Sequence, residues 1–457
     1  MRQAPRKPNE AESKIEPAKN DNLIVQTREY ELITPLFGGG VEPGQYDDLT
    51  PIRGTEIRGH LRFWWRATRG GRYGDDLDAL RKDEALIWGA ASTAKAPRPA
   101  QVQIVVESRA TGQPIRYREL DPDLQYAAFP LQEGNKPIRS GVRFALRISF
   151  PQKIEFLDEN GRTQVFKNVT AEVEAALWAW EAFGGVGART RRGFGALRCT
   201  HKDGVAFSFA PAANNLVEVR NLIDDGLYEH LIEGKWPKDV PHLSVDIFYC
   251  RISLVKRSSD EAWKTLIGGL KKFRQHRPGF GRSRWPEPDA IRKLTKQWLK
   301  PGVKEPSHPG HLPNPNNSGK FPRAAFGLPI VFHFKDSDEA NPTNTDKDPR
   351  DVVLRLLSHD RLASPLILRP LCLSEGRYVG IAILLEGTLQ PEDFYANDID
   401  LVLAEKDGKR PFANGLEAEL SSVESKSIKE IVTNNPLLGK KTDPLIAFLN
   451  RIQKEDE

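Results

Sequence analysis

The first half of the chain alternates between strand-like and helix-like hydrophobic patterns. Hydrophobic and polar positions alternate over 22–34, and β-branched or aromatic residues recur at every second position over 102–108 and 142–150. All three patterns predict strands. The clearest helix is predicted over 169–185, where Thr170 can cap the start and the following glycines can end it.

The second half repeats this order of elements. A strand predicted over 242–255 precedes helices over 261–273 and 289–300, and further strands are predicted over 328–334 and 377–387. In both halves a strand and a helix are followed by a loop rich in glycine and arginine, although no close sequence repeat is present. This repeated order predicts an α+β fold with two related domains.

Composition predicts the boundaries of these domains. Residues 1–21 are rich in Pro, Lys, Glu and Asn and predict a disordered leader. We expect an N-terminal domain over 22–215 and a C-terminal domain over 216–457. The C-terminal domain would carry two long irregular insertions, one rich in Pro and Asn near 300–320 and one acidic near 335–351.

The overall composition is typical of a soluble globular protein. Hydrophobic residues make up 39% of the 457 positions, yet no run of eighteen apolar residues occurs, so no membrane span is expected. Cys199, Cys250 and Cys372 lie far apart and form no CxxC pair, which favours a reducing, cytoplasmic location. A net charge of +5 is modest, so any nucleic-acid site must depend on where the arginines cluster.

The segment GGVGARTRRGFG at 184–195 combines glycines with arginines. It fits neither a dinucleotide fingerprint nor a P-loop, because Thr190 stands where the third glycine would fall and the loop follows a helix instead of preceding one. The remaining interpretation is that its amides and arginines contact phosphate, the alternative being a solvated basic loop. The candidate residues are Gly184, Gly185, Gly187, Arg189, Arg191, Arg192 and Gly193.

A second candidate surface lies on a short helix predicted from Ile57 to Thr68. Arginines four residues apart fall within an arc of about 80° on such a helix, where they repel one another unless an anion lies between them. Trp65 or Phe63 could stack on a base. The alternative is that the aromatic rings are core and the arginines pair with acidic neighbours. The candidate residues are Arg53, Arg58, Arg62, Trp65, Arg66 and Arg69.

A third candidate surface is the loop RQHRPGFGRSRWPEP at 274–288. Arg274, Arg282 and Arg284 are its candidates for phosphate contact. Trp285 is a candidate for base stacking, although a tryptophan before a proline also commonly anchors a loop in the core.

Catalytic arrangements are sparse. His60 lies beside the arginine stripe and could act as an acid or base in RNA cleavage, but a core or capping role is more common for such a residue. His308 and His311 have no third ligand nearby, so no metal site is predicted. The residues give no reason to expect a catalytic site or a cofactor.

Several ungapped blocks resemble the first-subunit family of the Cmr complexes of type III-B CRISPR systems, within the RAMP superfamily. The resemblance covers most of the chain from about residue 22 onward. The blocks are TPLFGGG at 34–40, IRGHLRFWWRAT at 57–68, GGVGARTRRGFG at 184–195, GFGRSRWPEP at 279–288 and FPRAAFGLPIVFHF at 321–334.

The resemblance implies two ferredoxin-like, RRM-related domains and a non-catalytic subunit that caps the 3′ end region of the CRISPR RNA. It also implies help in binding the guide–target RNA duplex for antiviral defence, with CRISPR RNA, target RNA and neighbouring RAMP subunits as partners and no cofactor. Two alternatives stay open: a metal-independent CRISPR RNA endoribonuclease, and a protein–protein adaptor that binds RNA only within the complex. The RNA contacts carried over from the family fall on Arg58, Arg62, Arg66, Arg189, Arg191 and Arg192.

Overall fold

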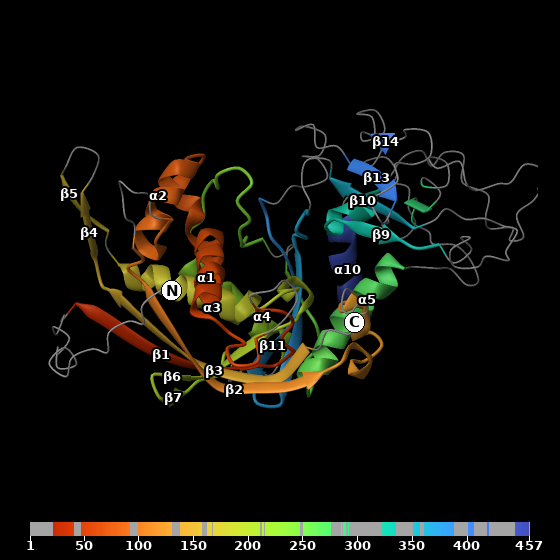
Figure 1. Ribbon diagram of the computed structural model, residues 1–457, viewed down its shortest axis with the longest axis horizontal. Coiled ribbons are helices and arrows are strands. Elements are labelled where there is room, and N and C mark those ends of the chain that lie inside the picture. The colour runs from red at the N-terminus through yellow and green to blue at the C-terminus, as the bar shows by residue number, and fades with distance from the viewer. Residues whose placement is uncertain are drawn as a thin grey trace, which may run out of the picture.

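The computed structural model has the α+β architecture expected from the sequence, with helices packed on antiparallel sheets (Figure 1). The description is limited to part of the chain. The described residues are 22–40, 47–91, 99–129, 138–157, 162–166, 168–210, 213, 215–246, 250–275, 285, 287–288, 291, 321–334, 351–356, 361–387, 401–405, 418–419 and 444–456.

The N-terminal part has ferredoxin-like topology. A five-stranded antiparallel sheet has the order β2-β3-β1-β6-β7, and helices α1 and α3 lie on one side of it (Figure 1). Along the chain, β1, α1, β2, β3, α3 and β6 follow the β-α-β-β-α-β pattern of that fold. The bounds are β1 Leu23–Leu32, α1 Gly54–Arg69, β2 Gln103–Ile115, β3 Ile138–Pro151, α3 Val169–Phe183, β6 Leu197–Lys202 and β7 Val205–Ala206.

The C-terminal part repeats most of this topology. Its three-stranded sheet has the order β11-β12-β8, which matches the order of the first three strands of the N-terminal unit. The bounds are β8 Cys250–Ile252, α5 Ser259–Arg274, β11 Leu366–Ser374, β12 Arg377–Leu384 and α10 Pro444–Asp456. These two ferredoxin-like arrangements agree with the fold class that the resemblance implies.

Smaller elements surround these two units. A four-stranded sheet has the order β14-β13-β10-β9, and a two-stranded hairpin is formed by β4 and β5. Helix α4 packs on α3, so it lies against the N-terminal unit although the predicted boundary at residue 215 precedes it. The bounds are α2 Leu77–Trp88, β4 Ile154–Leu157, β5 Thr163–Phe166, α4 Leu216–His230, β9 Ile330–Phe332, β10 Val352–Leu356, β13 Leu401–Glu405 and β14 Ala418–Glu419.

Three of the predicted elements need correction. The helix expected from Ile57 begins at Gly54, and α3 is capped by the side chain of Asn168, which accepts a hydrogen bond from the amide of Ala171 at 3.2 Å, and not by Thr170. Within 242–255, the described strand covers only Cys250–Ile252. The predicted helix at 289–300 lies almost entirely outside the described residues, as do the leader and both predicted insertions.

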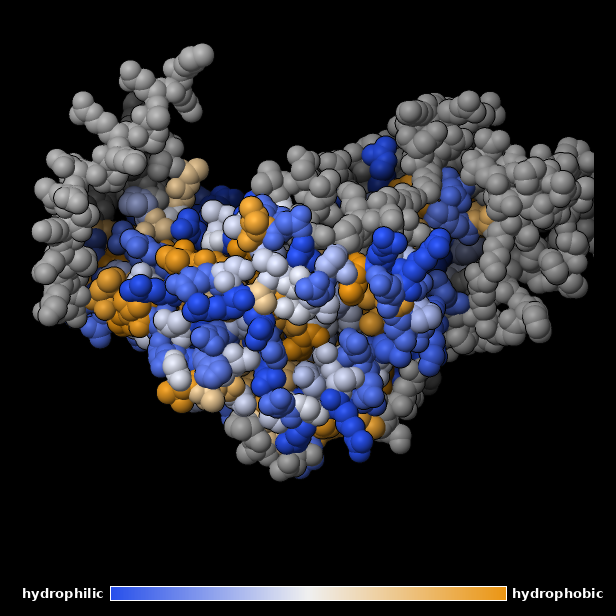
Figure 2. Space-filling view, turned by 60° about the horizontal axis from the view of Figure 1, so that its bottom comes forward, coloured by the Kyte–Doolittle hydropathy of each residue, from blue (hydrophilic) through white to orange (hydrophobic). Residues whose placement is uncertain are grey.

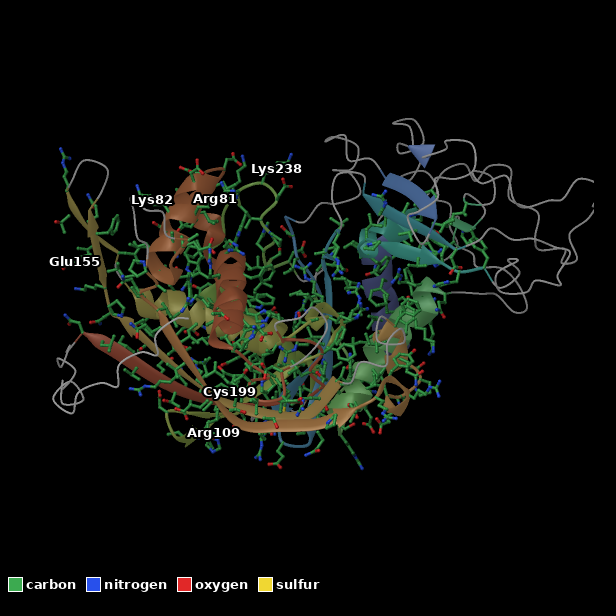
Figure 3. The ribbon with its side chains drawn as sticks, viewed as in Figure 1. Arg81, Lys82, Arg109, Glu155, Cys199 and Lys238 are labelled. Atoms are coloured by element: carbon green, nitrogen blue, oxygen red, sulfur yellow. The ribbon has the colours of Figure 1, made fainter. Side chains whose placement is uncertain are left out.

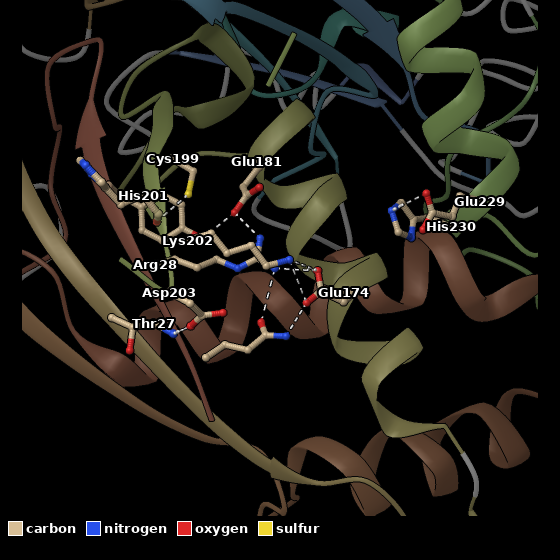
Figure 4. Close-up of polar contacts among 12 residues, drawn as sticks. Thr27, Arg28, Glu174, Glu181, Cys199, His201, Lys202, Asp203, Glu229 and His230 are labelled. Atoms are coloured by element: carbon tan, nitrogen blue, oxygen red, sulfur yellow. Dashed lines mark hydrogen bonds and ion pairs between the residues drawn. The ribbon is translucent and has the colours of Figure 1, made fainter. Parts of the chain in front are cut away.

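A buried ionic network fixes α3 on the sheet (Figure 4). The guanidinium of Arg28 on β1 lies 2.6 Å from a carboxylate oxygen of Glu174 and 2.8 Å from one of Glu181. The hydroxyl of Tyr30 donates to Glu181 at 2.6 Å. Burial alone would lower the pKa of Arg28, but the two carboxylates raise it overall. Because every charge has a close partner, this network holds β1 and α3 in one register.

Arg369 joins the two units. It lies on β11, its side chain is fully buried, and its guanidinium donates to the carbonyl oxygens of Glu181 at 2.8 Å, Gly184 at 2.7 Å and Leu197 at 3.0 Å. The first two carbonyls belong to the C-terminal end of α3, where the helix dipole favours a cation. Burial lowers the pKa of Arg369 to about 9. This side chain therefore fixes the end of α3 to the C-terminal sheet.

We predict that Arg369→Met lowers the free energy of unfolding by about 3–5 kcal/mol, because it leaves three buried carbonyls without a donor. Chemical denaturation measures the change. The matched control is Arg109→Met on β2, since the Arg109 side chain is 52% exposed and surface substitutions shift stability by about 0.5 kcal/mol or less. Equal stability of the two variants would contradict this role for Arg369.

Candidate nucleic-acid interface

The glycine-rich loop at 184–195 connects α3 to β6 and lies between the two units. Its 3-10 turn, Thr190–Arg192, packs against β11. Each of its three arginines donates to a backbone carbonyl outside the loop, which holds the side chains in fixed directions. The acceptors are Ala127 at 2.5 Å for Arg189, Ser364 for Arg191, and Leu366 at 2.8 Å and Phe326 at 3.0 Å for Arg192.

Together with two neighbouring arginines, these side chains form a positive group that no carboxylate of the described residues neutralises. We call Arg189, Arg191, Arg192, Arg274 and Arg361 the arginine cluster. Within the part of the chain that the structure describes, none of the five forms an ion pair with an acidic side chain. Burial, and then the charges of neighbouring arginines, lower the pKa of Arg189 to about 10 and that of Arg192 to about 9. A guanidinium remains protonated at neutral pH, so the cluster favours an anionic ligand.

The glycines of the loop serve packing, which corrects the expectation that their amides approach an anion. The amide of Gly187 donates to a carboxylate oxygen of Glu56 at 2.7 Å, so a protein group already occupies it. Gly193 has a φ of 85°, and a Cβ there would lie 2.3 Å from the indole nitrogen of Trp263. Gly184 and Gly185 are buried in the same way. The anion-binding capacity of the loop therefore resides in its arginines.

Most of the arginines in the stripe on α1 pair with buried carboxylates, and two of them share one carboxylate. Arg62 pairs with Glu84 at 2.7 Å, and Arg66 pairs with the same carboxylate. Arg69 lies 3.7 Å from a carboxylate oxygen of Glu172. These contacts match the alternative in which the stripe pairs with acidic neighbours, and they reduce the charge that the helix presents to a ligand.

The two remaining arginines near the start of α1 form no ion pair with a buried carboxylate in the part of the chain that the structure describes. Arg53 donates to the carbonyl of Gly40 at 2.8 Å. Arg58 forms no ion pair with a described residue, and its buried Nε has no hydrogen-bond partner among them. Of the predicted stripe, Arg53 and Arg58 therefore keep a charge that is available to an anion.

Trp65 and Trp285 were expected to stack on bases, but both are buried, which corrects that expectation. Trp65 is fully buried and donates from its indole nitrogen to Glu172 at 2.7 Å. Trp285 is 2% exposed and donates to the carbonyl of Phe273 at 3.0 Å. Neither ring is open to a base. The half-buried ring near the loop is Phe63, whose centroid lies 5.7 Å from the guanidinium carbon of Arg191.

The third candidate loop is only partly described. Arg274 ends α5, and its guanidinium carbon lies 5.6 Å from the centre of the Phe326 ring. It belongs to the arginine cluster. Arg282 and Arg284 lie outside the described residues, so their proposed contacts stay predictions.

The face of the N-terminal sheet opposite the helices offers no aromatic platform. In Figure 2, where the lower side of Figure 1 comes forward, mostly hydrophilic residues are interspersed with hydrophobic ones. The outward positions of the two central strands carry no aromatic side chain; they are Val25, Thr27, Glu29 and Glu31 on β1, and Arg143, Ala145, Arg147 and Ser149 on β3. RRM domains stack bases on aromatic rings of these strands, and these outward positions lack such rings.

The described residues contain no group of three or more His, Cys, Asp or Glu side chains that could hold a metal ion. Likewise, none of the helices in the described ranges is both long enough and apolar enough to span a membrane.

Sequence reasoning missed several residues that shape this interface. Arg361 and Arg369 stand alone in sequence, far from any glycine-rich segment, so no local pattern marks them. Glu84 and Glu172 are acidic residues within helices, and only the fold brings them to α1.

Residues 29–198 match the model of the RAMP superfamily, which confirms the resemblance carried by the motifs within that range. The chain is similar to the CRISPR system Cmr subunit Cmr1-2 of Pyrococcus furiosus, with 28% identity over 182 residues, which cover 37% of this chain and 91% of that protein. It is also similar to subunit Cmr1-1 of the same organism, with 29% identity over 38% of this chain and 48% of that protein. The match thus spans about half the length of the latter relative.

The solved structures to which the chain is similar include the apo crystal structure of Cmr1 from Pyrococcus furiosus. It has 18% identity and a TM-score of 0.44, over 80% of this chain and 89% of that one. A chain of the type III-B Cmr-beta complex bound to cognate target RNA has 12% identity and a TM-score of 0.42, over 79% of this chain and 94% of that one.

We predict that Glu84→Gln lowers the free energy of unfolding by about 1–2 kcal/mol, because Arg62 and Arg66 lose their shared counter-charge while remaining partly solvated. Urea denaturation measures the change. Asp78→Asn on the same helix is the control, since the Asp78 side chain is 93% exposed and should matter little. If both variants unfold at the wild-type urea concentration, the ion pairs do not stabilise α1.

Proposed function

We propose that this chain is an RNA-binding subunit of a type III-B CRISPR effector complex. The similarity to Cmr1 proteins supports membership of such a complex. The observation that carries the RNA-binding role is the arginine cluster, a set of oriented guanidinium groups that no described carboxylate neutralises. Within the complex, we place the chain at the 3′ end region of the CRISPR RNA, where it would help hold the guide–target duplex.

The chemistry of the cluster suits recognition of the backbone of any RNA sequence. Guanidinium groups bind phosphate oxygens with paired hydrogen bonds, and phosphates carry no sequence information. Because carbonyls fix Arg189 and Arg192 in direction, little conformational entropy would be lost when phosphate binds. A subunit that must accept every guide requires this kind of contact.

We predict that Arg361→Glu weakens the affinity for single-stranded RNA about tenfold and reduces the slope of log affinity against log salt by about one. Arg361 is exposed, so the fold should tolerate the change. Filter binding across a salt series measures both quantities. The control, Arg109→Glu, makes the same change in net charge on β2, which Figure 3 shows at the bottom of the view. Equal losses in both variants would indicate a general charge effect and would contradict the assignment.

We further propose that the subunit binds RNA without cleaving it. The candidate base His60 has its Nε2 3.7 Å from a carboxylate oxygen of Glu56, beyond hydrogen-bond distance, and this nitrogen has no hydrogen-bond partner among the described residues. Glu56 accepts the amide of Gly187, so it is bound to the loop and does not orient His60 as a base. Labelled RNA incubated with the protein in EDTA should therefore remain at full length. Cleavage that disappears in His60→Ala would instead support the endoribonuclease alternative.

A further inference from the structure

Gly59 is a glycine that the fold does not require. It is exposed and lies inside α1, where glycine is the least favourable residue apart from proline. A Cβ built at this position would meet no atom of the described residues within 4 Å. The loop glycines differ, because a Cβ at Gly187 would lie 2.5 Å from the carbonyl oxygen of Phe37. Packing therefore explains the loop glycines and leaves Gly59 unexplained.

The open space beside Gly59 adjoins the glycine-rich loop. Residues three or four positions apart share one face of a helix, so Glu56 and Phe63 flank Gly59 on α1. Glu56 accepts the amide of Gly187, and the ring of Phe63 lies under the guanidinium of Arg191. The face of α1 at Gly59, where no side chain covers the helix backbone, therefore adjoins the side of the loop that carries the arginines.

The charged side chains around this space are three arginines and the carboxylate of Glu56, which already accepts the amide of Gly187. Arg62 and Arg66 lie three and seven residues after Gly59, on the same face of α1, and each is only partly neutralised because they share one carboxylate. Arg58 precedes Gly59, and its buried Nε has no hydrogen-bond partner among the described residues. An anionic chain suits these surroundings better than a protein surface of mixed charge.

We propose that Gly59 leaves a gap on α1 in which the sugar–phosphate backbone of RNA packs directly against the helix. The inference rests on the proposed function and extends it, since it adds a contact surface next to the arginine cluster. Arginine attraction brings the backbone to α1, and the missing side chain lets it reach van der Waals contact. A methyl group there would hold the backbone away from the guanidinium groups and weaken every contact at once.

The test replaces Gly59 by Ala and by Leu, two good helix formers of increasing size. We expect the temperature of unfolding to stay the same or rise, because helix propensity improves and nothing clashes. We expect the affinity for labelled single-stranded RNA to fall about fivefold with Ala and further with Leu. A fall in thermal stability would overturn the inference, since it would mean that the fold itself requires this glycine.

The control is Gly268→Ala in α5, another glycine inside a helix. A Cβ there would lie 3.7 Å from a carboxylate oxygen of Asp123, which is ordinary contact, so stability should again be kept while RNA affinity stays unchanged. If Gly59→Ala binds RNA normally while Arg361→Glu binds weakly, the gap is not an RNA contact although the proposed function stands. If both bind normally, or if the wild type fails to bind, the proposed function fails. If Gly59→Ala impairs only assembly with partner subunits, the occupant is a protein and the inference is overturned.

Discussion

The arrangement of the interface depends on one buried cation. Arg369 reaches from the C-terminal sheet to the end of α3 and donates to carbonyls of Glu181, Gly184 and Leu197. Glu181 precedes the glycine-rich loop, Gly184 is its first residue and Leu197 follows it. The same side chain therefore fixes both ends of the loop and joins it to the second unit. Desolvating a guanidinium is costly, and the dipole at the end of α3 together with three hydrogen bonds offsets that cost.

The loop arginines use the same chemistry but leave their charge uncompensated. Arg189 and Arg192 donate to neutral carbonyls, which satisfy part of each guanidinium without adding a negative charge. Burial, and then the repulsion among neighbouring arginines, lower their pKa values, so the cluster is less stable alone than it would be beside an anion. Residues of functional sites often carry such strain, because a ligand can relieve it. The α1 arginines Arg62 and Arg66 differ from these, because both pair with the carboxylate of Glu84.

The hydrophobic pattern of the sequence predicted much of the fold, but it did not predict how the residues of the site are arranged. Alternation of apolar residues predicted β1, β3 and α3, because one face of each packs on the core. It missed β11, whose residues are nearly all buried and therefore show no period. The role of Trp65 was undecidable from sequence, since it depends on a hydrogen bond to Glu172, 107 positions away. The glycines of the loop were misread for a similar reason. Their need for space comes from Phe37 and Trp263, which only the tertiary structure brings there.

Some glycines and arginines of this chain serve the fold, and others are available to a ligand. The atoms around each residue show which of the two roles it has. An arginine with a buried carboxylate, such as Arg69, stabilises the fold, whereas one that contacts only carbonyls, such as Arg192, retains charge for a ligand. At Gly193 a Cβ would clash with neighbouring atoms, so glycine is needed for packing. At Gly59 a Cβ would meet no atom of the described residues within 4 Å. The retained charges and the open space occur together, on facing parts of α1 and the loop. Since neither stabilises the isolated chain, both are best explained by one ligand that supplies negative charge and fills the gap.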